Sequence, residues 1–217
     1  MKRTRRNRLK YAEQSIISKH ISEHKGIYFF ILIIFTMGFI IGSIKSVFID
    51  ETLKNESHNY ILNFVEYLKT QEIDNKILIK ESLSANIKPV IYITLFGLIL
   101  VGAPLILVYI GLYGYSVGFT ITSIMSSLGK TSGIAFILTM MIPQEVVLLL
   151  TIFILAVNAI LFSKTMLKMN SRNTNIRAES LKYISICVIA AIISVGVSMF
   201  ETYIGSSLAK TVIQLIT

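Results

Sequence analysis

Hydrophobic and polar positions follow one another in long blocks along this chain, and the blocks predict apolar helices joined by polar segments. The apolar blocks cover residues 27–49, 89–128, 133–162 and 183–204. A helix needs about 20 consecutive apolar residues to cross the hydrocarbon layer of a membrane. We therefore predict an all-α integral membrane protein that forms a single polytopic domain over residues 1–217.

The third apolar block, from Gly133 to Phe162, is interrupted by Pro143, Gln144 and Glu145. It is too long for one upright span and too short for two. A proline kinks a helix or begins a new one. We expect a half-helix over residues 133–142 that dips into the membrane, followed by a full span over 143–162. The alternative is one long, tilted helix that is kinked at the proline.

The second block is long enough for two spans, and its tyrosines and glycines favour a tight turn near Tyr109–Gly114. The five predicted spans are then 27–49, 89–110, 112–128, 143–162 and 183–204.

The charges of the polar segments predict the topology. Residues 1–25 and 163–182 are rich in lysine and arginine, whereas residues 50–88 carry many acids. Because basic loops stay in the cytoplasm, the N-terminus is expected inside and the 50–88 loop outside. The apolar spacing in that loop favours two short amphipathic helices on the outer surface. With five spans, the 205–217 tail is also outside.

Composition agrees with a membrane protein and limits the partners. Hydrophobic residues make up 53% of the chain and charged residues 15%, which is outside the range of soluble proteins. The net charge of +9 lies beside the apolar blocks, where it sets topology. We therefore expect a lipid bilayer as the surroundings of the chain and no nucleic acid as its partner.

Motifs of enzymes and metal sites are missing from the sequence. It contains no GxxxxGK[ST], GxSxG or HExxH pattern. The three histidines, His20, His24 and His58, fall on both sides of the membrane in the predicted topology. We expect no catalytic residue, no metal and no cofactor, and hence a protein that is not an enzyme.

One group of polar residues is a candidate site. Lys45, Glu145 and Glu201 reach a similar depth near the outer rim, and Pro143 and Gln144 adjoin the second of them. Charges inside a membrane usually face protein or water and mark ion sites or contacts with partners. In the alternative interpretation, each side chain extends separately to the headgroups.

Two glycine pairs have the GxxxG spacing that lets membrane helices approach closely. They are Gly38 with Gly42 in the first span, and Gly114 with Gly118 in the second apolar block. We expect both pairs to mark helix-packing faces.

Four segments in order carry a resemblance to a known family. They are HISEHKGIYFFILIIFTMGFIIG at 20–42, GAPLILVYIGLYGYSVGFT at 102–120, IPQE at 142–145 and FETY at 200–203. Together they resemble stage II sporulation protein M over nearly the whole chain. One departure is Tyr113, at a turn where that family often carries a basic residue.

The resemblance implies a scaffold in the bacterial cell membrane, at the sporulation septum or the mother-cell engulfing membrane. Its partners would be the wall-degrading stage II sporulation proteins D and P, which remodel peptidoglycan during engulfment of the forespore. A homo-oligomer is compatible with this role. The family is also similar to permease-like membrane components, so a transporter or channel subunit is the alternative.

Overall fold

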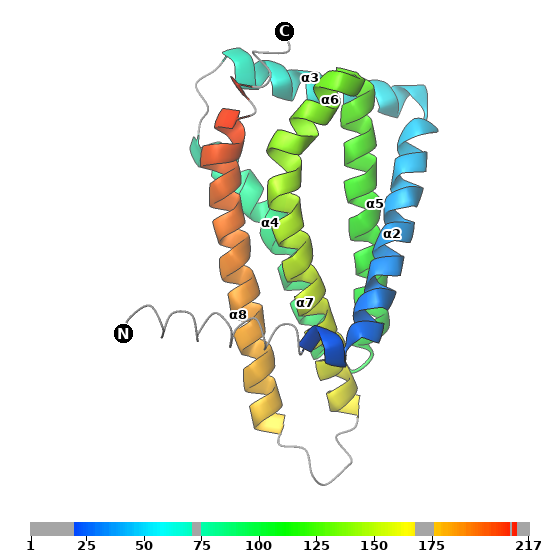
Figure 1. The fold of residues 1–217 in the computed structure, drawn as a ribbon, viewed down its shortest axis with the longest axis vertical. Helices are drawn as coiled ribbons and strands as arrows, with labels where there is room; N and C mark the ends of the chain where they lie inside the picture. The colour runs from blue at the N-terminus through cyan, green and yellow to red at the C-terminus, as the bar shows by residue number, and fades with distance from the viewer. Residues whose placement is uncertain (1–19, 71–74, 168–175, 209, 212–217) are drawn as a thin grey trace.

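The computed structural model describes residues 20–70, 75–167, 176–208 and 210–211, and these form a bundle of helices without a strand (Figure 1). The elements are α2 (Lys25–Val47), α3 (Glu51–Thr70), α4 (Asn75–Leu98), α5 (Gly102–Leu128), α6 (Lys130–Phe136), the π-helical segment η1 (Ile137–Met141), α7 (Ile142–Leu167), α8 (Ile176–Phe200) and the π-helical segment η2 (Glu201–Gly205). Helix α3 lies across one end, called the upper end here. Helix α2 begins, α7 ends and α8 begins at the opposite, lower end.

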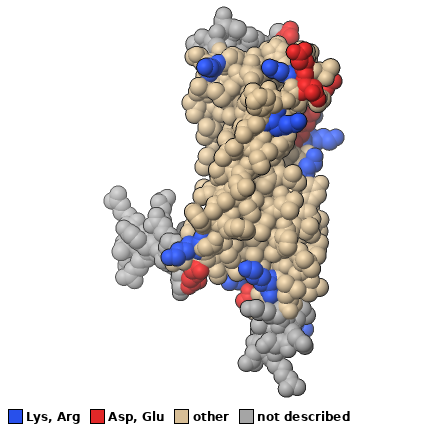
Figure 2. Space-filling view, turned by 90° about the vertical axis from the view of Figure 1, so that its right-hand side faces the viewer, with Lys and Arg blue, Asp and Glu red and all other residues tan. Residues whose placement is uncertain are grey.

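Four helices are long and apolar enough to cross a membrane. They are α2, α5, the continuous helix Lys130–Leu167 and the continuous helix Arg177–Leu208. Charged side chains gather toward the two ends of the molecule, with a broad uncharged band between them (Figure 2). The predicted all-α, multi-pass membrane protein is therefore confirmed for the described residues.

Helix α4 is the remaining long helix that enters the bundle, and it differs from the other four. It packs against α5, α7 and α8, but it carries Lys76, Lys80, Glu81 and Lys88. These charges keep it out of the set of clearly apolar spans. Five spans, a cytoplasmic N-terminus and an external C-terminus therefore stay predictions.

The predicted turn near Tyr109–Gly114 is wrong, because α5 runs through these residues without a break. The chain reverses at residues 99–101, between α4 and α5, where Gly102 N–H bonds to the carbonyl of Ile99 at 2.9 Å. A Cβ on Gly102 would overlap the carbonyl of Phe96, so this tight reversal needs a glycine. Pro104 follows in the first turn of α5, where the absence of a backbone N–H costs little.

The predicted half-helix over 133–142 is also wrong. Residues 130–167 form one continuous helix, so the alternative of a single long helix, kinked at the proline, describes the chain better. Pro143 cannot donate to the carbonyl four residues earlier, and its ring crowds that carbonyl. The backbone responds with the π-helical η1, in which Ile142 N–H bonds to the carbonyl of Ile137, five residues back.

The polar 50–88 segment forms helix α3 and the first turns of α4. Phe64 and Val65 of α3 pack against Ile124, Phe136 and Met140, so the apolar stripe of the predicted amphipathic helix covers the upper ends of α5, α6 and η1. The second predicted helix continues into the bundle as α4, since Pro89 lies inside that helix and does not begin it.

Helices α2 and α5 form the closest helix pair, called the glycine seam here. A Cβ on Gly38 or Gly42 would overlap the backbone carbonyl of Gly111 or Tyr115, respectively. Likewise, a Cβ on Gly114 or Gly118 would overlap the carbonyl of Phe35 or Phe39. The structure thus places the two GxxxG pairs face to face, on parallel helices.

Helix α7 is the centre of the bundle. Its residues Ile152, Leu155, Ala156, Val157 and Ala159 are fully buried, and it contacts α2, α4, α5 and α8. Residues 1–19 of the basic segment, 168–175 of the 163–182 segment, and 209 and 212–217 of the tail lie outside the described residues.

Candidate functional site

Polar side chains from four helices meet inside the upper half of the bundle. We call them the polar cluster, which consists of Ser82 and Asn86 on α4, Tyr113 on α5, Glu145 on α7, Ser198 on α8 and Glu201 at the start of η2. Ser82 and Ser198 are buried, and the two carboxylates are half-buried. The polar cluster is the strongest candidate site in the described residues.

Glu201 is held by α4. The Ser82 hydroxyl donates to its Oε2, and the Asn86 amide nitrogen donates to the same oxygen at 3.1 Å. The Asn86 amide nitrogen is also 3.1 Å from Ser198 Oγ and 3.2 Å from Ser82 Oγ. These contacts hold α4 close to α8, because a hydrogen bond forms only when its donor and acceptor atoms are about 3 Å apart.

Glu145 is held by α5 in the same way. The Tyr113 hydroxyl donates to its Oε1 at 2.7 Å. Tyr113 lies between Gly111 and Tyr115, whose backbones face Gly38 and Gly42 in the glycine seam. Since Lys25 and Lys45 on α2 are about 30 Å apart along the helix, which matches the hydrocarbon thickness, Tyr113 lies within that layer.

The two carboxylates interact electrostatically, and the segments beside them are in contact. Glu201 is a charge neighbour of Glu145, and η1 contacts η2. Within the described residues their hydrogen-bond partners are a tyrosine, a serine and an asparagine, and neither is bonded to a lysine or arginine. Two carboxylates in such surroundings can bind a proton or a cation, or can lock helices together.

Both π-helical segments lie next to the polar cluster. Segment η1 ends at Met141, two residues before Pro143, and η2 begins with Glu201. A π-turn widens the helix and changes the direction of the side chains around it, and such turns are frequent at functional sites. Glu145 follows the end of η1 by four residues, and Glu201 is the first residue of η2.

The structure brings only some of the predicted site residues together. Glu145 and Glu201 join the polar cluster, and Gln144 lies beside it with a buried Oε1 that has no hydrogen-bond partner among the residues that the structure describes. Pro143 is exposed at the start of α7. Lys45 is exposed near the end of α2, which packs on α5 and lies on the side of the bundle away from α8 (Figure 1).

Ser82, Asn86, Tyr113 and Ser198 are members that the sequence analysis missed. Ser82 and Asn86 were part of a predicted outer loop, and Tyr113 was assigned to a turn. A signal was present, because Ser194, Ser198 and Thr202 repeat every four residues and Ser82 and Asn86 have the same spacing. Polar residues at that spacing form a stripe on one helix face.

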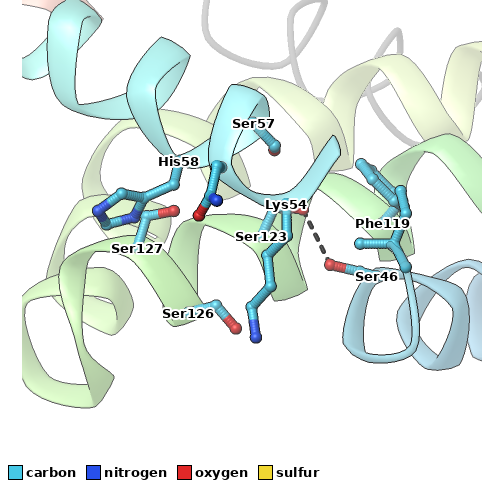
Figure 3. A pocket seen from close by; sticks show the side chains of 10 residues that line it. Ser46, Lys54, Ser57, His58, Phe119, Ser123, Ser126 and Ser127 are labelled. Atoms are coloured by element: carbon cyan, nitrogen blue, oxygen red, sulfur yellow. Dashed lines mark hydrogen bonds between the residues drawn. The ribbon is translucent and has the colours of Figure 1, made fainter. Parts of the chain in front are cut away.

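A second polar site lies at the upper end, between α3 and α5 (Figure 3). This upper pocket has a volume of about 260 Å³, and its polar lining comes from Ser46, Lys54, Asn55, Ser57, His58, Ser123, Ser126 and Ser127. Ser46 Oγ and Ser123 Oγ are 2.9 Å apart and close the top of the glycine seam. The hydroxyls of Ser57, Ser126 and Ser127 have no hydrogen-bond partner among the described residues, so they are available to a ligand or partner.

Of the three histidines, only His58 lines one of these sites, the upper pocket. His20 and His24 lie edge to face at the lower end, with ring centroids 5.0 Å apart. Burial, and next the charge of His24, lower the pKa of His20 below its ordinary value of 6.5. In the part of the chain that the structure describes, no three His, Cys, Asp or Glu residues are grouped as metal ligands.

These features define the chain as a multi-pass α-helical membrane protein with a polar cluster inside its bundle. The family model for stage II sporulation protein M matches residues 27–206, and the chain belongs to that family. The match includes the glycine seam, the polar cluster and the upper pocket. Neither the curated proteins nor the solved structures that were compared give a match.

Proposed function

We propose that this chain is a membrane scaffold of sporulation that recruits peptidoglycan-degrading partners to the septum. The observation that carries the proposal is the family match over residues 27–206. The partners are stage II sporulation proteins D and P, and the setting is the sporulation septum or the mother-cell engulfing membrane. There the assembled partners remodel the septal wall before the forespore is engulfed.

The arrangement of the bundle supports a scaffold. The polar cluster joins α4 to α8 and α5 to α7, and the glycine seam joins α2 to α5. Such cross-links give a platform of fixed shape, which preorganises a surface for binding. Helix α3 and the upper pocket then offer unpaired hydroxyls at the end of the bundle that faces the wall in the predicted topology.

We also propose that the chain itself is not an enzyme. Ser127 and His58 both line the upper pocket, but no hydrogen bond joins them. A serine nucleophile needs a base within hydrogen-bond reach and a third group that orients the base. Cleavage of the wall is therefore left to the partners.

Co-purification from early-sporulating cells tests the proposal. The tagged wild type, extracted in mild detergent, should recover both partners. Ser57→Trp fills the upper pocket and should lose most of that recovery, whereas Thr52→Trp, an exposed position on α3 outside the pocket, should keep it. Wild-type protein that is folded but recovers neither partner would contradict the scaffold. Equal recovery by the two variants would show that the partners do not bind at the upper pocket.

A transporter or channel subunit is the second candidate, and the polar cluster favours it. Glu145 and Glu201 are neighbouring carboxylates inside a membrane bundle, without a basic hydrogen-bond partner among the described residues, and such pairs are typical of proton and ion sites. This function requires a charge that Glu145 or Glu201 can gain and lose. A scaffold requires only their hydrogen bonds, so the two functions differ in their response to Glu→Gln.

A further inference from the structure

A groove lies between α7 and α8 on the outer side of the bundle. Its lower part is a cavity of about 440 Å³, with apolar walls formed mainly by Ile154, Ile186, Ile189, Ala190 and Ile193. Ile193 also lines a second cavity of about 320 Å³, which continues upward toward Gln144 and Phe200. Ile189 is 55% exposed, so the groove opens to the surroundings of the bundle, which are lipid in a membrane.

The lower mouth of the groove is polar. His20, Tyr28, Asn158 and Lys182 line it, and a small adjoining cavity adds His24 and Glu179. The Asn158 amide donates to the carbonyl of Ile154 at 2.8 Å, and Tyr28 Oη and His20 Nδ1 are 3.2 Å apart. The Lys182 ammonium has neither a hydrogen bond nor an ion pair within the described residues, although it lies next to both cavities.

The dimensions of the groove fit one lipid chain. Lys182 and Ile193 are 11 positions apart on α8, which is about 16 Å along a helix. Half of a hydrocarbon core of about 30 Å is about 15 Å. A phosphate beside Lys182 would therefore place one acyl chain of the same leaflet along the isoleucine walls.

The charge around the mouth favours an anionic headgroup. Among the described residues, Lys25, Lys164, Arg177 and Lys182 lie toward the lower ends of α2, α7 and α8, against Glu23 and Glu179. This excess of positive charge at the end of one apolar groove is the arrangement that attracts anionic lipids.

We infer that the α7–α8 groove is a binding site for an anionic glycerophospholipid, with the phosphate at Lys182 and one acyl chain between the two helices. The site is separate from the polar cluster and from the upper pocket. It would fix the spacing of α7 and α8 at their lower ends, where the side-chain bonds of the polar cluster do not reach.

Quenching of tryptophan fluorescence by brominated lipids tests this site. The chain contains no tryptophan, so a single introduced tryptophan gives the whole signal. Ile189→Trp places the reporter in the groove, seven positions above Lys182. Leu32→Trp is the matched control on α2, seven positions above Lys25 and 47% exposed. Each variant is reconstituted in vesicles of phosphatidylcholine and phosphatidylglycerol, and one or the other lipid is brominated.

At Leu32→Trp, Lys25 lies beside open lipid and should give a phosphatidylglycerol preference of at most about fivefold, which is about 1 kcal/mol. At Ile189→Trp the preference should be clearly larger, because the groove holds the phosphate against Lys182 whereas the lipid beside Lys25 exchanges freely. Lys182→Gln should remove the preference in the groove, whereas Lys45→Gln, at the other end of the bundle, should not. Native mass spectrometry of the chain without a tryptophan should show the same loss of bound phosphatidylglycerol in Lys182→Gln.

Equal preference at the two reporters would mean that only unselective lipid surrounds the bundle, and it would overturn the inference. A groove reporter that neither lipid quenches would mean that protein, such as a partner's transmembrane helix or a second copy of the chain, fills the groove. That result would overturn it as well.

Discussion

The glycine seam and the polar cluster hold membrane helices together in two different ways. Along the seam, α2 and α5 approach until backbone meets backbone, and no side chain at Gly38 or Gly42 stands between them. In the polar cluster, α4 and α8 are joined by the side chains of Ser82, Asn86 and Glu201. The glycine seam depends on residues that carry no side chain, whereas the polar cluster depends on particular polar side chains.

The difference follows from lipid as a solvent. Apolar side chains gain little by leaving lipid tails for a helix interface, so association depends on close packing and on interhelical hydrogen bonds. Close packing tolerates no added volume, whereas a hydrogen bond tolerates an isosteric replacement. The two regions should therefore respond oppositely to changes of size and of chemistry.

The largest expected effect comes from adding one methyl group to the seam. Gly42→Ala places a Cβ against the carbonyl of Tyr115 and should destabilise the fold by about 2–3 kcal/mol, since the helices must move apart. Gly26→Ala, where a Cβ meets nothing within 4 Å, is the control on the same helix and should not destabilise. Thermal unfolding in detergent measures both, and equal stability of the two variants would refute the close approach.

A smaller effect is expected where the chemistry of the polar cluster changes. Glu201→Leu removes the acceptor of the Ser82 hydroxyl and one of the acceptors of the Asn86 amide, and it should cost about 1–3 kcal/mol. Glu201→Gln keeps an oxygen acceptor and should cost clearly less. The same unfolding assay measures both variants, and a glutamine variant as unstable as the leucine variant would show that charge holds α4 in place.

The Tyr113–Glu145 pair gives a third and weaker test. Tyr113→Phe, Glu145→Leu and the double variant form a cycle that isolates the single hydrogen bond between them, because neither replacement can form it. We expect a coupling of about 0.6 kcal/mol, the usual value for such bonds in membrane proteins. Zero coupling would mean that the bond contributes nothing to helix packing.

His20, outside both regions, supplies the smallest expected effect. Burial, followed by His24, lowers its pKa below 6.5, so the unfolded chain takes up a proton before the folded one does. Wild-type stability should therefore fall as the pH drops through 6.5 and level off below the folded-state pKa. In neutral detergent, the shift in unfolding temperature between pH 7.5 and 5.5 should be larger for wild type than for His20→Gln. Identical shifts would contradict a lowered pKa of His20 in the folded chain.

Block lengths and spacing predicted the helical membrane fold and placed the candidate residues of the seam. The positions of the turn and of the kink were not predictable from the same signals. Glycines 111, 114 and 118 indicated a turn, but small residues serve a turn and a packing face equally well, and here they face α2. The true reversal at residues 99–101 has no charge or polar residue to mark it, and only Gly102 and Pro104 indicate it.

The candidate site was predictable only in part. Carboxylates inside apolar blocks are visible in a sequence, so Glu145 and Glu201 were found. Their partners are neutral polar residues, which cost little in a membrane helix and therefore carry a weak signal. Lys45 lies near the upper end of α2, but a position along a helix does not fix the side that the residue faces, and α2 lies away from α8 in the bundle.

Partner recovery with Glu201→Gln and Glu201→Leu, compared at equal levels of the protein in sporulating membranes, tests the scaffold account most directly. The account predicts that Glu201→Gln recovers the two wall-degrading partners as wild type does, because α4 stays bonded to α8. Glu201→Leu should lose them. If folded Glu201→Gln protein failed as completely as Glu201→Leu, the function would depend on the charge itself, and the transporter proposal would replace the scaffold.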